Sequence, residues 1–276
     1  MRQVLVNGQV SEHLSLLDRS IHYGDGVFET IAVCEGAPLC WEQHLERMAK
    51  GCHTLGIPAP SQPVLEKEAA QLIRNQNPGV LKIIISRGQG GRGYQSPEEL
   101  SPVRILGLYD WPNYPAENSR DGIRAGLCET RLGHNPLLAG IKHLNRLEQV
   151  LARSEAGAEG FPEMLMLDIS GSVIEGTMSN VFLVSANRLL TPDLGSCGIA
   201  GIVRGLILEQ APDLALSAEI KPITLEEVGN ADELFFCNSI MGIWPVKRLL
   251  GKAYPVGNIT GMIKNRLMEN RQIVAL

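Results

Sequence analysis

The stretch NPLLAGIKHLNRLEQVLARSEA, residues 135–156, decides how the fold of this chain is understood. Leucine and valine recur at helical spacing in its second half, which predicts a helix over about 143–157. Lys142 precedes that helix, after an apolar, glycine-containing approach. Apolar surroundings disfavour the charged form of an amine, so such a lysine can act as a nucleophile and form a Schiff base. On this window alone, a lysine whose amine snorkels to water is the commoner structure.

Further along, the stretch VIEGTMSNVF at 173–182 places Glu175 in the middle of an apolar strand. Glutamate is depleted in strands and costly to bury alone. The carboxylate would therefore need a cationic partner, and a protonated pyridine nitrogen would be one. An exposed glutamate at a strand edge is the alternative.

Two later stretches predict ligand-binding groups. In CGIAGIVRG, 197–205, Gly198 and Gly201 precede a helix, and the amides at a helix start form a ready phosphate site. In ELFFCNSI, 233–240, a buried strand ends at Asn238 and Ser239, at a position where strands commonly present ligand-binding groups. Each stretch alone is weak evidence for a ligand site; helix starts of this kind, for example, are common.

The stretch ISRGQGGRGYQSP at 85–97 raises a different possibility, because three glycines have the spacing of a dinucleotide fingerprint: Gly88, Gly90 and Gly93. That fingerprint requires a helix to open at the third glycine. Pro97 and Pro102 leave no room for a crossover helix before the strand expected at 104–110. A nicotinamide-binding protein is therefore a remote alternative. We expect instead a mobile loop, in which Arg87 and Arg92 are available to carboxylates.

Composition excludes several classes of protein. Of 276 residues, 44% are hydrophobic and 20% charged, as in ordinary globular proteins, and the net charge of −5 makes nucleic acid an unexpected partner. The six cysteines form no C-x-x-C pair and no histidine cluster accompanies them, so we expect reduced thiols in a cytoplasmic protein and no metal. No apolar run is long enough to span a bilayer, and the first residues predict a strand and turn rather than a signal peptide.

The predicted elements divide the chain into a small N-terminal α/β domain over 1–112, a linker over 113–122 and a larger domain over 123–276. Strands come in hairpin clusters with interspersed helices, which favours a mixed α/β (α+β) class over regular βαβ alternation. Strands are expected at 27–33, 80–86, 104–110, 123–128, 164–167, 173–177, 180–184, 189–191 and 233–237, and helices at about 42–55, 63–74, 143–157, from 202, and 258–269.

Together these stretches resemble the fold-type IV pyridoxal-phosphate (PLP) enzymes, the group of branched-chain and D-amino-acid aminotransferases. The resemblance covers nearly the whole chain and rests on HYGDGVFET (22–30), HLERM (44–48), Lys142 with Asn145, VIEGTMSNVF (173–182), GIVRG (201–205) and FFCNSIMGIWPV (235–246). Within the group, residues 81–94 and 131–156 are similar to the 4-amino-4-deoxychorismate lyases, which make 4-aminobenzoate and pyruvate for folate synthesis. D-amino-acid or branched-chain aminotransferase activity is the alternative.

The resemblance implies a role for each matching residue. Lys142 would hold PLP as a Schiff base, and Glu175 would keep its pyridine nitrogen protonated. The phosphate would be bound by Arg47, the amides of Ile202 and Val203, and the hydroxyl of Ser239.

Substrate recognition is assigned by the same resemblance. Arg92 and Tyr94 lie in the loop that recognises substrate carboxylates in D-amino-acid aminotransferases, and Asn238 is placed with them. Thr30 would stand near the cofactor face and relay a proton. The resemblance also implies a homodimer, with the small molecule aminodeoxychorismate as substrate.

Overall fold

The computed structural model describes residues 3–73 and 78–274. The chain forms two compact units, Met1–Pro112 with Ile141–Asn145, and Asn113–Gly140 with Arg146–Leu276. The second unit includes the segment 113–122, which was expected to be a linker and which contains the short helix α4 (Ala116–Arg120). None of the helices among the described residues has the length and apolar character needed to cross a membrane.

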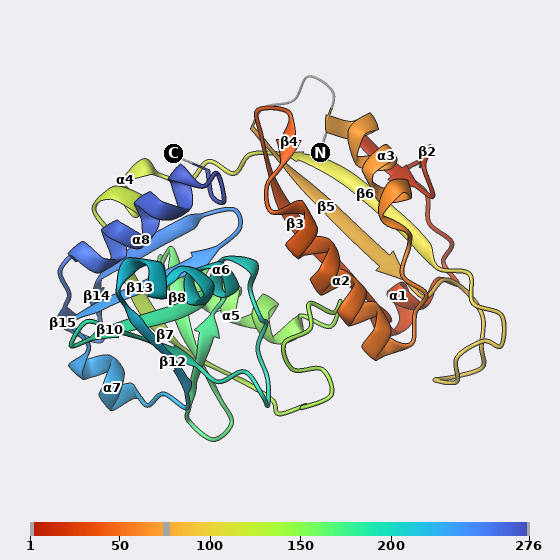
Figure 1. The fold of residues 1–276 in the computed structure, drawn as a ribbon. Helices are drawn as coiled ribbons and strands as arrows, with labels where there is room; N and C mark the ends of the chain where they lie inside the picture. Colours follow the sequence, from red (N-terminus) through yellow and green to blue (C-terminus); the bar gives the residue numbers. More distant parts are fainter. Residues whose placement is uncertain (1–2, 74–77, 275–276) are drawn as a thin grey trace. The chain divides into compact units, whose positions relative to one another are not determined.

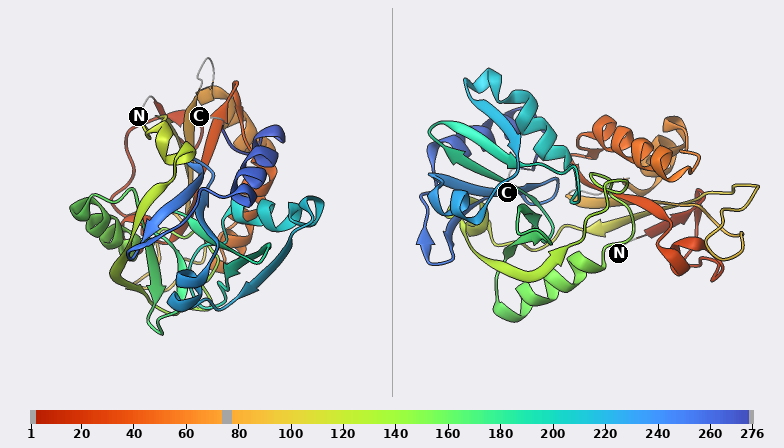
Figure 2. Two further views of the ribbon diagram at one scale, coloured as in Figure 1. Left: turned by 90° about the vertical axis from the view of Figure 1, so that its left-hand side faces the viewer. Right: turned by 90° about the horizontal axis from the view of Figure 1, so that it is seen from below.

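The first unit is built on a six-stranded antiparallel sheet with the order β2-β1-β6-β5-β3-β4 (Figure 1). Its strands are β1 (Gln3–Val6), β2 (Gln9–Val10), β3 (Gly26–Cys34), β4 (Ala37–Pro38), β5 (Gly79–Ser86) and β6 (Val103–Asp110). Its helices are α1 (Arg19–Tyr23), α2 (Trp41–Leu55) and α3 (Gln62–Ile73), and α2 and α3 lie on the same side of the strands (Figure 2, right). The strand order is that of hairpins, so the glycine stretch joins antiparallel neighbours β5 and β6 and opens no helix.

Side chains of β3 point alternately to the core face and to the opposite face, and this determines which of them can take part in a binding site. Val27, Ile31 and Val33 are buried in the core with residues of α2 and α3. Successive side chains point to opposite faces of a strand, so Phe28 and Thr30 lie on the face away from that core.

The second unit has a nine-stranded sheet with the order β12-β11-β10-β13-β14-β7-β8-β9, and β15 pairs with β14. Its strands are β7 (Ile123–Leu132), β8 (Glu163–Asp168), β9 (Val173–Gly176), β10 (Asn180–Ser185), β11 (Arg188–Pro192), β12 (Ser217–Lys221), β13 (Glu233–Asn238), β14 (Gly242–Leu249) and β15 (Lys252–Ala253). Besides α4, it contains α5 (Leu147–Glu159), α6 (Ile202–Gln210), the short helix η1 (Pro212–Leu214), α7 (Leu225–Asn230) and α8 (Asn258–Glu269). Both β8 and β10 are almost wholly buried, as a strand covered on both faces requires.

The expected helix over 143–157 is wrong at its start, because α5 begins at Leu147. The preceding residues pair with the edge of β3: the Phe28 amide donates to the Lys142 carbonyl (2.9 Å) and the Leu144 amide to the Gly26 carbonyl (3.0 Å). These backbone groups are used in a strand-like bridge and cannot join a helix.

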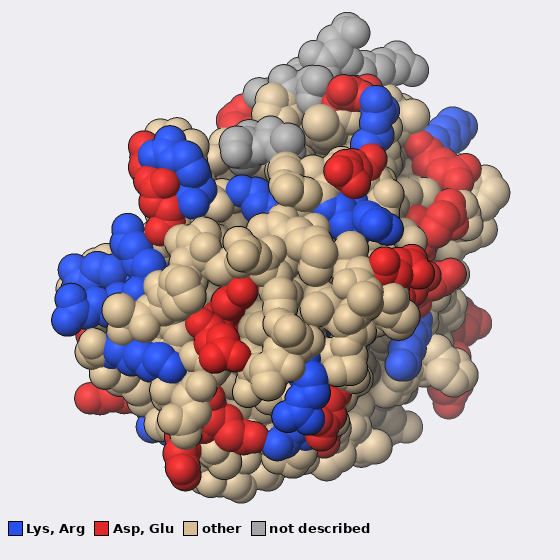
Figure 3. All heavy atoms as spheres, turned by 60° about the vertical axis from the view of Figure 1, so that its left-hand side comes forward, with Lys and Arg blue, Asp and Glu red and all other residues tan. Residues whose placement is uncertain are grey.

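Charged side chains are mixed in sign over much of the surface. On the face drawn in Figure 3, Lys and Arg lie beside Asp and Glu, in keeping with the small net charge.

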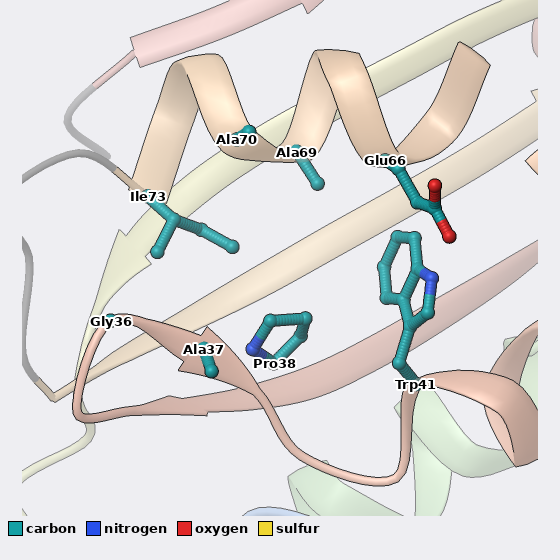
Figure 4. A pocket seen from close by; sticks show the side chains of 8 residues that line it. All are labelled: Gly36, Ala37, Pro38, Trp41, Glu66, Ala69, Ala70 and Ile73. Atoms are coloured by element: carbon teal, nitrogen blue, oxygen red, sulfur yellow. The ribbon is translucent and has the colours of Figure 1, made fainter. Parts of the chain in front are cut away.

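The first unit also has a cavity of about 510 Å³, lined by the β3–β4 turn, Trp41 at the start of α2, and α3 (Figure 4). Its walls are mostly apolar, with the Glu66 carboxylate beside the Trp41 ring. None of the residues that line it is among the site residues expected from the sequence.

Candidate active site

The extended segment that pairs with β3 carries Lys142. Its Nζ lies 4.4 Å from the centroid of the Phe28 ring, a cation–π distance. The lysine therefore occupies a fixed position on the face of β3 that the core leaves open, rather than the start of a helix.

Thr30 follows Phe28 on that face, and its cross-strand partner is Lys82. The Lys82 Nζ lies 5.3 Å from the Phe28 ring. The face thus presents a hydroxyl and two amines around one aromatic ring, a polar surface suited to an anionic ligand.

Arg47 is held by a buried carboxylate. Glu29 on β3 is completely buried, and it accepts a hydrogen bond from the Arg47 Nε (2.8 Å) and a contact from the His44 Nδ1 (2.7 Å). Burial would raise the pKa of Glu29, but the charge of Arg47 and the hydrogen bonds from both partners outweigh it and lower that pKa to about 2. Burial lowers the pKa of His44, a shift that Glu29 opposes. The ion pair fixes the plane of the Arg47 guanidinium.

The glycine loop is anchored by Arg19, which lies almost buried on α1. Its guanidinium donates to the carbonyls of four loop residues, and its Nε donates to Asp25 Oδ2 (2.8 Å). The four carbonyls belong to Gly90, Gly93, Tyr94 and Gln95. One side chain therefore holds the loop at four of its residues.

This anchoring changes two expectations. The conformation of the loop requires glycine: Gly91 has φ +78°, and an added Cβ would lie 2.1 Å from the Gln95 carbonyl oxygen. Arg87 is not available to a substrate, because it is buried and donates to Asp25 and to the carbonyls of Leu55 and Gly56. The expectation of a mobile loop offering Arg87 was therefore wrong for that residue, whereas Arg92 is exposed.

Tyr94 also lies at the exposed tip of the loop, with 87% of its surface accessible. Its ring contacts that of Tyr23 at 5.4 Å between centroids. The anchored loop thus presents a cation and a phenol outward, the combination expected for binding a carboxylate.

In the second unit, Glu175 on β9 is buried, as the apolar strand predicted. Its Oε2 accepts from the Ile199 amide (2.8 Å) and its Oε1 from the Gln149 side chain (3.2 Å). The alternative of an exposed strand-edge glutamate is therefore excluded.

A second buried carboxylate, Glu163, organises the turn after Glu175. It accepts from the Thr177 amide (2.8 Å), the Thr177 hydroxyl and the Ser179 hydroxyl (2.7 Å). Burial of Glu163 could not be predicted from the sequence, because a glutamate at the first position of a strand gives no signal of burial. The turn places Glu175 and Asn180 at the ends of successive strands.

Asn180 connects that turn to the start of α6. Its Oδ1 accepts from the Gly201 amide (3.0 Å) and its Nδ2 donates to the Ile199 carbonyl (2.8 Å). A Cβ on Gly201 would lie 2.0 Å from Asn180 Oδ1, so the close approach requires glycine. The amides of Ile202 and Val203 follow in the first turn of α6, where backbone donors have no partner within the helix.

Asn238 and Ser239 follow one another at the end of β13. The Asn238 Oδ1 accepts from the amides of Ile240 and Met241 (2.8 and 2.7 Å), and its Nδ2 donates to the Met178 carbonyl. In this structure Asn238 therefore shapes the turn that carries Ser239.

The predicted residues thus form two groups, one in each unit. Thr30, Arg47, Arg92, Tyr94 and Lys142 belong to the first unit, whereas Glu175, Ile202, Val203, Asn238 and Ser239 belong to the second. Sequence reasoning missed a set of buried and partly buried polar side chains that organise these regions: Arg19, Asp25, Glu29, His44, Glu163 and Asn180. Asp25 and Glu29 stand in the quoted stretch HYGDGVFET, which was their one available signal.

Comparison with known proteins defines the class. A family model described as amino-transferase class IV matches residues 26–249, and the chain belongs to that family. It has the fold of the fold-type IV enzymes, which depend on PLP.

Both lyases and aminotransferases of this family are similar to the chain. The chain is 38% identical to the aminodeoxychorismate lyase of Vibrio harveyi, over 95% of the chain and 98% of that protein. The crystal structure of 4-amino-4-deoxychorismate lyase from Pseudomonas aeruginosa is similar with a TM-score of 0.93 and 43% identity, over 98% and 100% of the two chains. A branched-chain amino acid aminotransferase structure from Escherichia coli has a TM-score of 0.87 at 26% identity, over 99% and 96%.

The donor set in this structure fits PLP. A lysine amine suits an aldehyde, a buried carboxylate suits a protonated pyridine nitrogen, and helix-start amides suit a phosphate. The Gly201 position, which a Cβ would fill, lies directly before those amides.

Proposed function

We propose that this chain is a PLP-dependent carbon–oxygen lyase that converts 4-amino-4-deoxychorismate into 4-aminobenzoate and pyruvate, a step toward folate. The similarity to the two lyases over nearly the whole chain supports it. The observation that carries it is the anchored glycine loop, in which buried Arg19 holds the segment bearing Arg92 and Tyr94.

Each cofactor-binding residue would have the role that the resemblance implied. Lys142 would bind it covalently, Glu175 would hold a proton on its ring nitrogen, and Arg47, Ser239 and the amides of Ile202 and Val203 would bind its phosphate. When bound, PLP supplies an electron sink for the electron pair left by a departing proton.

The chain's own side chains would transfer the protons and bind the substrate. The Lys142 amine would remove the proton from the substrate carbon that bears nitrogen. Departure of the enolpyruvyl oxygen then makes the substrate ring aromatic, so positioning matters more than strong acid catalysis. The Thr30 hydroxyl would relay a proton to the enolpyruvyl methylene, which yields pyruvate. Arg92 and Tyr94 would bind the substrate carboxylates, and Asn238 would also bind the substrate.

An amino-acid aminotransferase is the second candidate. A putative branched-chain-amino-acid aminotransferase of Methanocaldococcus jannaschii is 29% identical over 98% of the chain. An aminotransferase requires a 2-oxo acid to accept the amino group, whereas the lyase reaction consumes no second substrate. Dependence on an acceptor therefore separates the two.

We propose further that the chain acts as a homodimer in the cytoplasm. The apolar face of α5 is exposed at Leu147, Val150 and Leu151, which a second copy would cover. All six cysteines are free thiols, as a reducing compartment favours.

The proposed role of Lys142 is tested by spectroscopy of the purified protein. Wild type is expected to show the absorption band of covalently bound PLP, and Lys142→Ala is expected to lose it. Lys82→Ala, which removes the other amine near Phe28, is the matched control and should keep the band. A colourless wild type reconstituted with PLP, or a band that persists in Lys142→Ala, would contradict the assignment.

A further inference from the structure

Three potential metal ligands from distant parts of the sequence meet in the second unit. The side chains of His134, Asp168 and Cys197 each offer one donor atom, and these atoms all lie within 4.8 Å of one another. They supply one nitrogen, one oxygen and one sulfur. The functional assignments above use none of them.

The backbone explains why these residues meet. Strands β7 and β8 run parallel, and Leu132 pairs with Asp168, so the loop carrying His134 leaves the sheet beside Asp168. The Asn135 amide donates to the Ser196 carbonyl (2.8 Å), which joins that loop to the segment of Cys197. The arrangement therefore belongs to the fold and does not depend on surface side chains alone.

The donors are also oriented. The Oδ1 of Asp168 accepts from the amides of Ser170 and Ser172, both at 2.9 Å, which leaves Oδ2 directed at the His134 Nε2, also 2.9 Å away. His134 keeps about a third of its side chain exposed, which provides a route of entry, whereas Cys197 is buried.

The Cys197 thiol must lose its proton before its sulfur can bind a metal ion. Burial, reinforced by the charges of Asp168, Glu175 and Glu148, raises its pKa to about 12. A thiol of that kind is protonated at neutral pH, and a thiophilic metal ion displaces the proton when it binds.

We propose that His134, Asp168 and Cys197 form a binding site for a divalent ion of the zinc class. Imidazole, carboxylate and thiolate are the ligands that Zn²⁺ takes, whereas Mg²⁺ and Ca²⁺ require oxygen ligands. Zinc–ligand bonds of about 2.0–2.3 Å place tetrahedral ligands about 3.3–3.7 Å apart. The His134–Asp168 pair must open slightly and Cys197 must approach, with release of the thiol proton. The fourth position is left for water.

The site is tested by equilibrium dialysis of the purified holoenzyme against Zn²⁺ in excess Mg²⁺, followed by elemental analysis. Wild type is expected to retain one Zn²⁺ per chain. Cys197→Ser should weaken binding at least tenfold, because loss of even an outer-shell partner of a metal costs about 10–100-fold. His134→Gln should do the same, and it changes a partly exposed side chain, so it serves if Cys197→Ser does not fold.

Cys128→Ser is the matched control. Cys128 lies in the same apolar cluster as Cys197 and its thiol pKa is likewise raised to about 12, but its Sγ faces the Ala152 carbonyl. It should bind Zn²⁺ as wild type does. Absence of Zn²⁺ from wild type, or full retention in both Cys197→Ser and His134→Gln, would overturn the proposal.

Discussion

Arg47 shows how far single residues could be predicted. Its match to HLERM implied a phosphate ligand, and the structure adds the reason that its guanidinium is fixed, the fully buried Glu29. Burial of Glu29 could not be predicted, because alternation along β3 depends on which face α2 and α3 cover. A charged residue on the core face is rare unless it is paired.

Glu29 should therefore stabilise the fold in a pH-dependent way. Its pKa is about 2 in the folded chain against an ordinary 4.5, so its stabilising effect is complete above pH 4.5 and disappears as pH falls from 4.5 to 2. Glu29→Gln is expected to lower the free energy of unfolding at pH 7 by about 3 kcal/mol, because Arg47 loses its buried partner. Urea unfolding at several pH values measures this.

The difference between the variant and wild type should shrink below pH 4.5. Glu12→Gln, at an exposed position, is the control and should match wild type throughout. Equal stability of Glu29→Gln and wild type at pH 7 would show that the ion pair contributes nothing.

At the scale of elements, periodicity predicted most helices and strands but not their partners. The helix expected from residue 143 begins at Leu147, because residues 142–144 pair with β3, a contact between segments far apart in sequence. Strand β14 was missed, since Pro245 argues against a central strand. The structure resolves this conflict: β14 pairs with β13 up to Pro245 and with β7 from Val246 onward.

The start of α6 gives a prediction at the same scale. Gly201→Ala would place a Cβ 2.0 Å from Asn180 Oδ1 and displace the amides proposed to bind phosphate. We expect at least a tenfold weaker affinity for PLP, about 1.4 kcal/mol, measured by titrating the apoenzyme. Gly205→Ala in the same helix meets open space and should bind PLP normally. Unchanged affinity in Gly201→Ala would remove α6 from the phosphate site.

Helix α5 has one face that packs within the chain and another that is exposed and apolar. Its leucine and valine stripe predicted a helix, but that stripe is not the face that packs inward: Leu147 is 77% exposed, and the helix is buried at Ala152 and Ala156. A sequence alone cannot tell a core face from an interface, since both are apolar. The cluster of His134, Asp168 and Cys197 was missed for a related reason: only the parallel pairing of β7 and β8 brings its members together.

The proposed dimer makes α5 a sensitive position. Leu151→Glu would place a charge in an apolar interface, and we expect the dimer dissociation constant to rise at least tenfold, about 1.4 kcal/mol. Sedimentation equilibrium measures it. Leu250→Glu, at an exposed leucine in the turn between β14 and β15, should leave the dimer intact. A Leu151→Glu protein that remains as dimeric as wild type would place the interface elsewhere.

At the scale of the whole molecule, the proposed reaction is elimination without transfer of the amino group. Its most direct test is to incubate the purified PLP-loaded protein with 4-amino-4-deoxychorismate and no 2-oxo acid, and to quantify both products. We expect 4-aminobenzoate and pyruvate in equal amounts, over many turnovers per chain. Formation of product only after a 2-oxo acid is added would contradict this expectation.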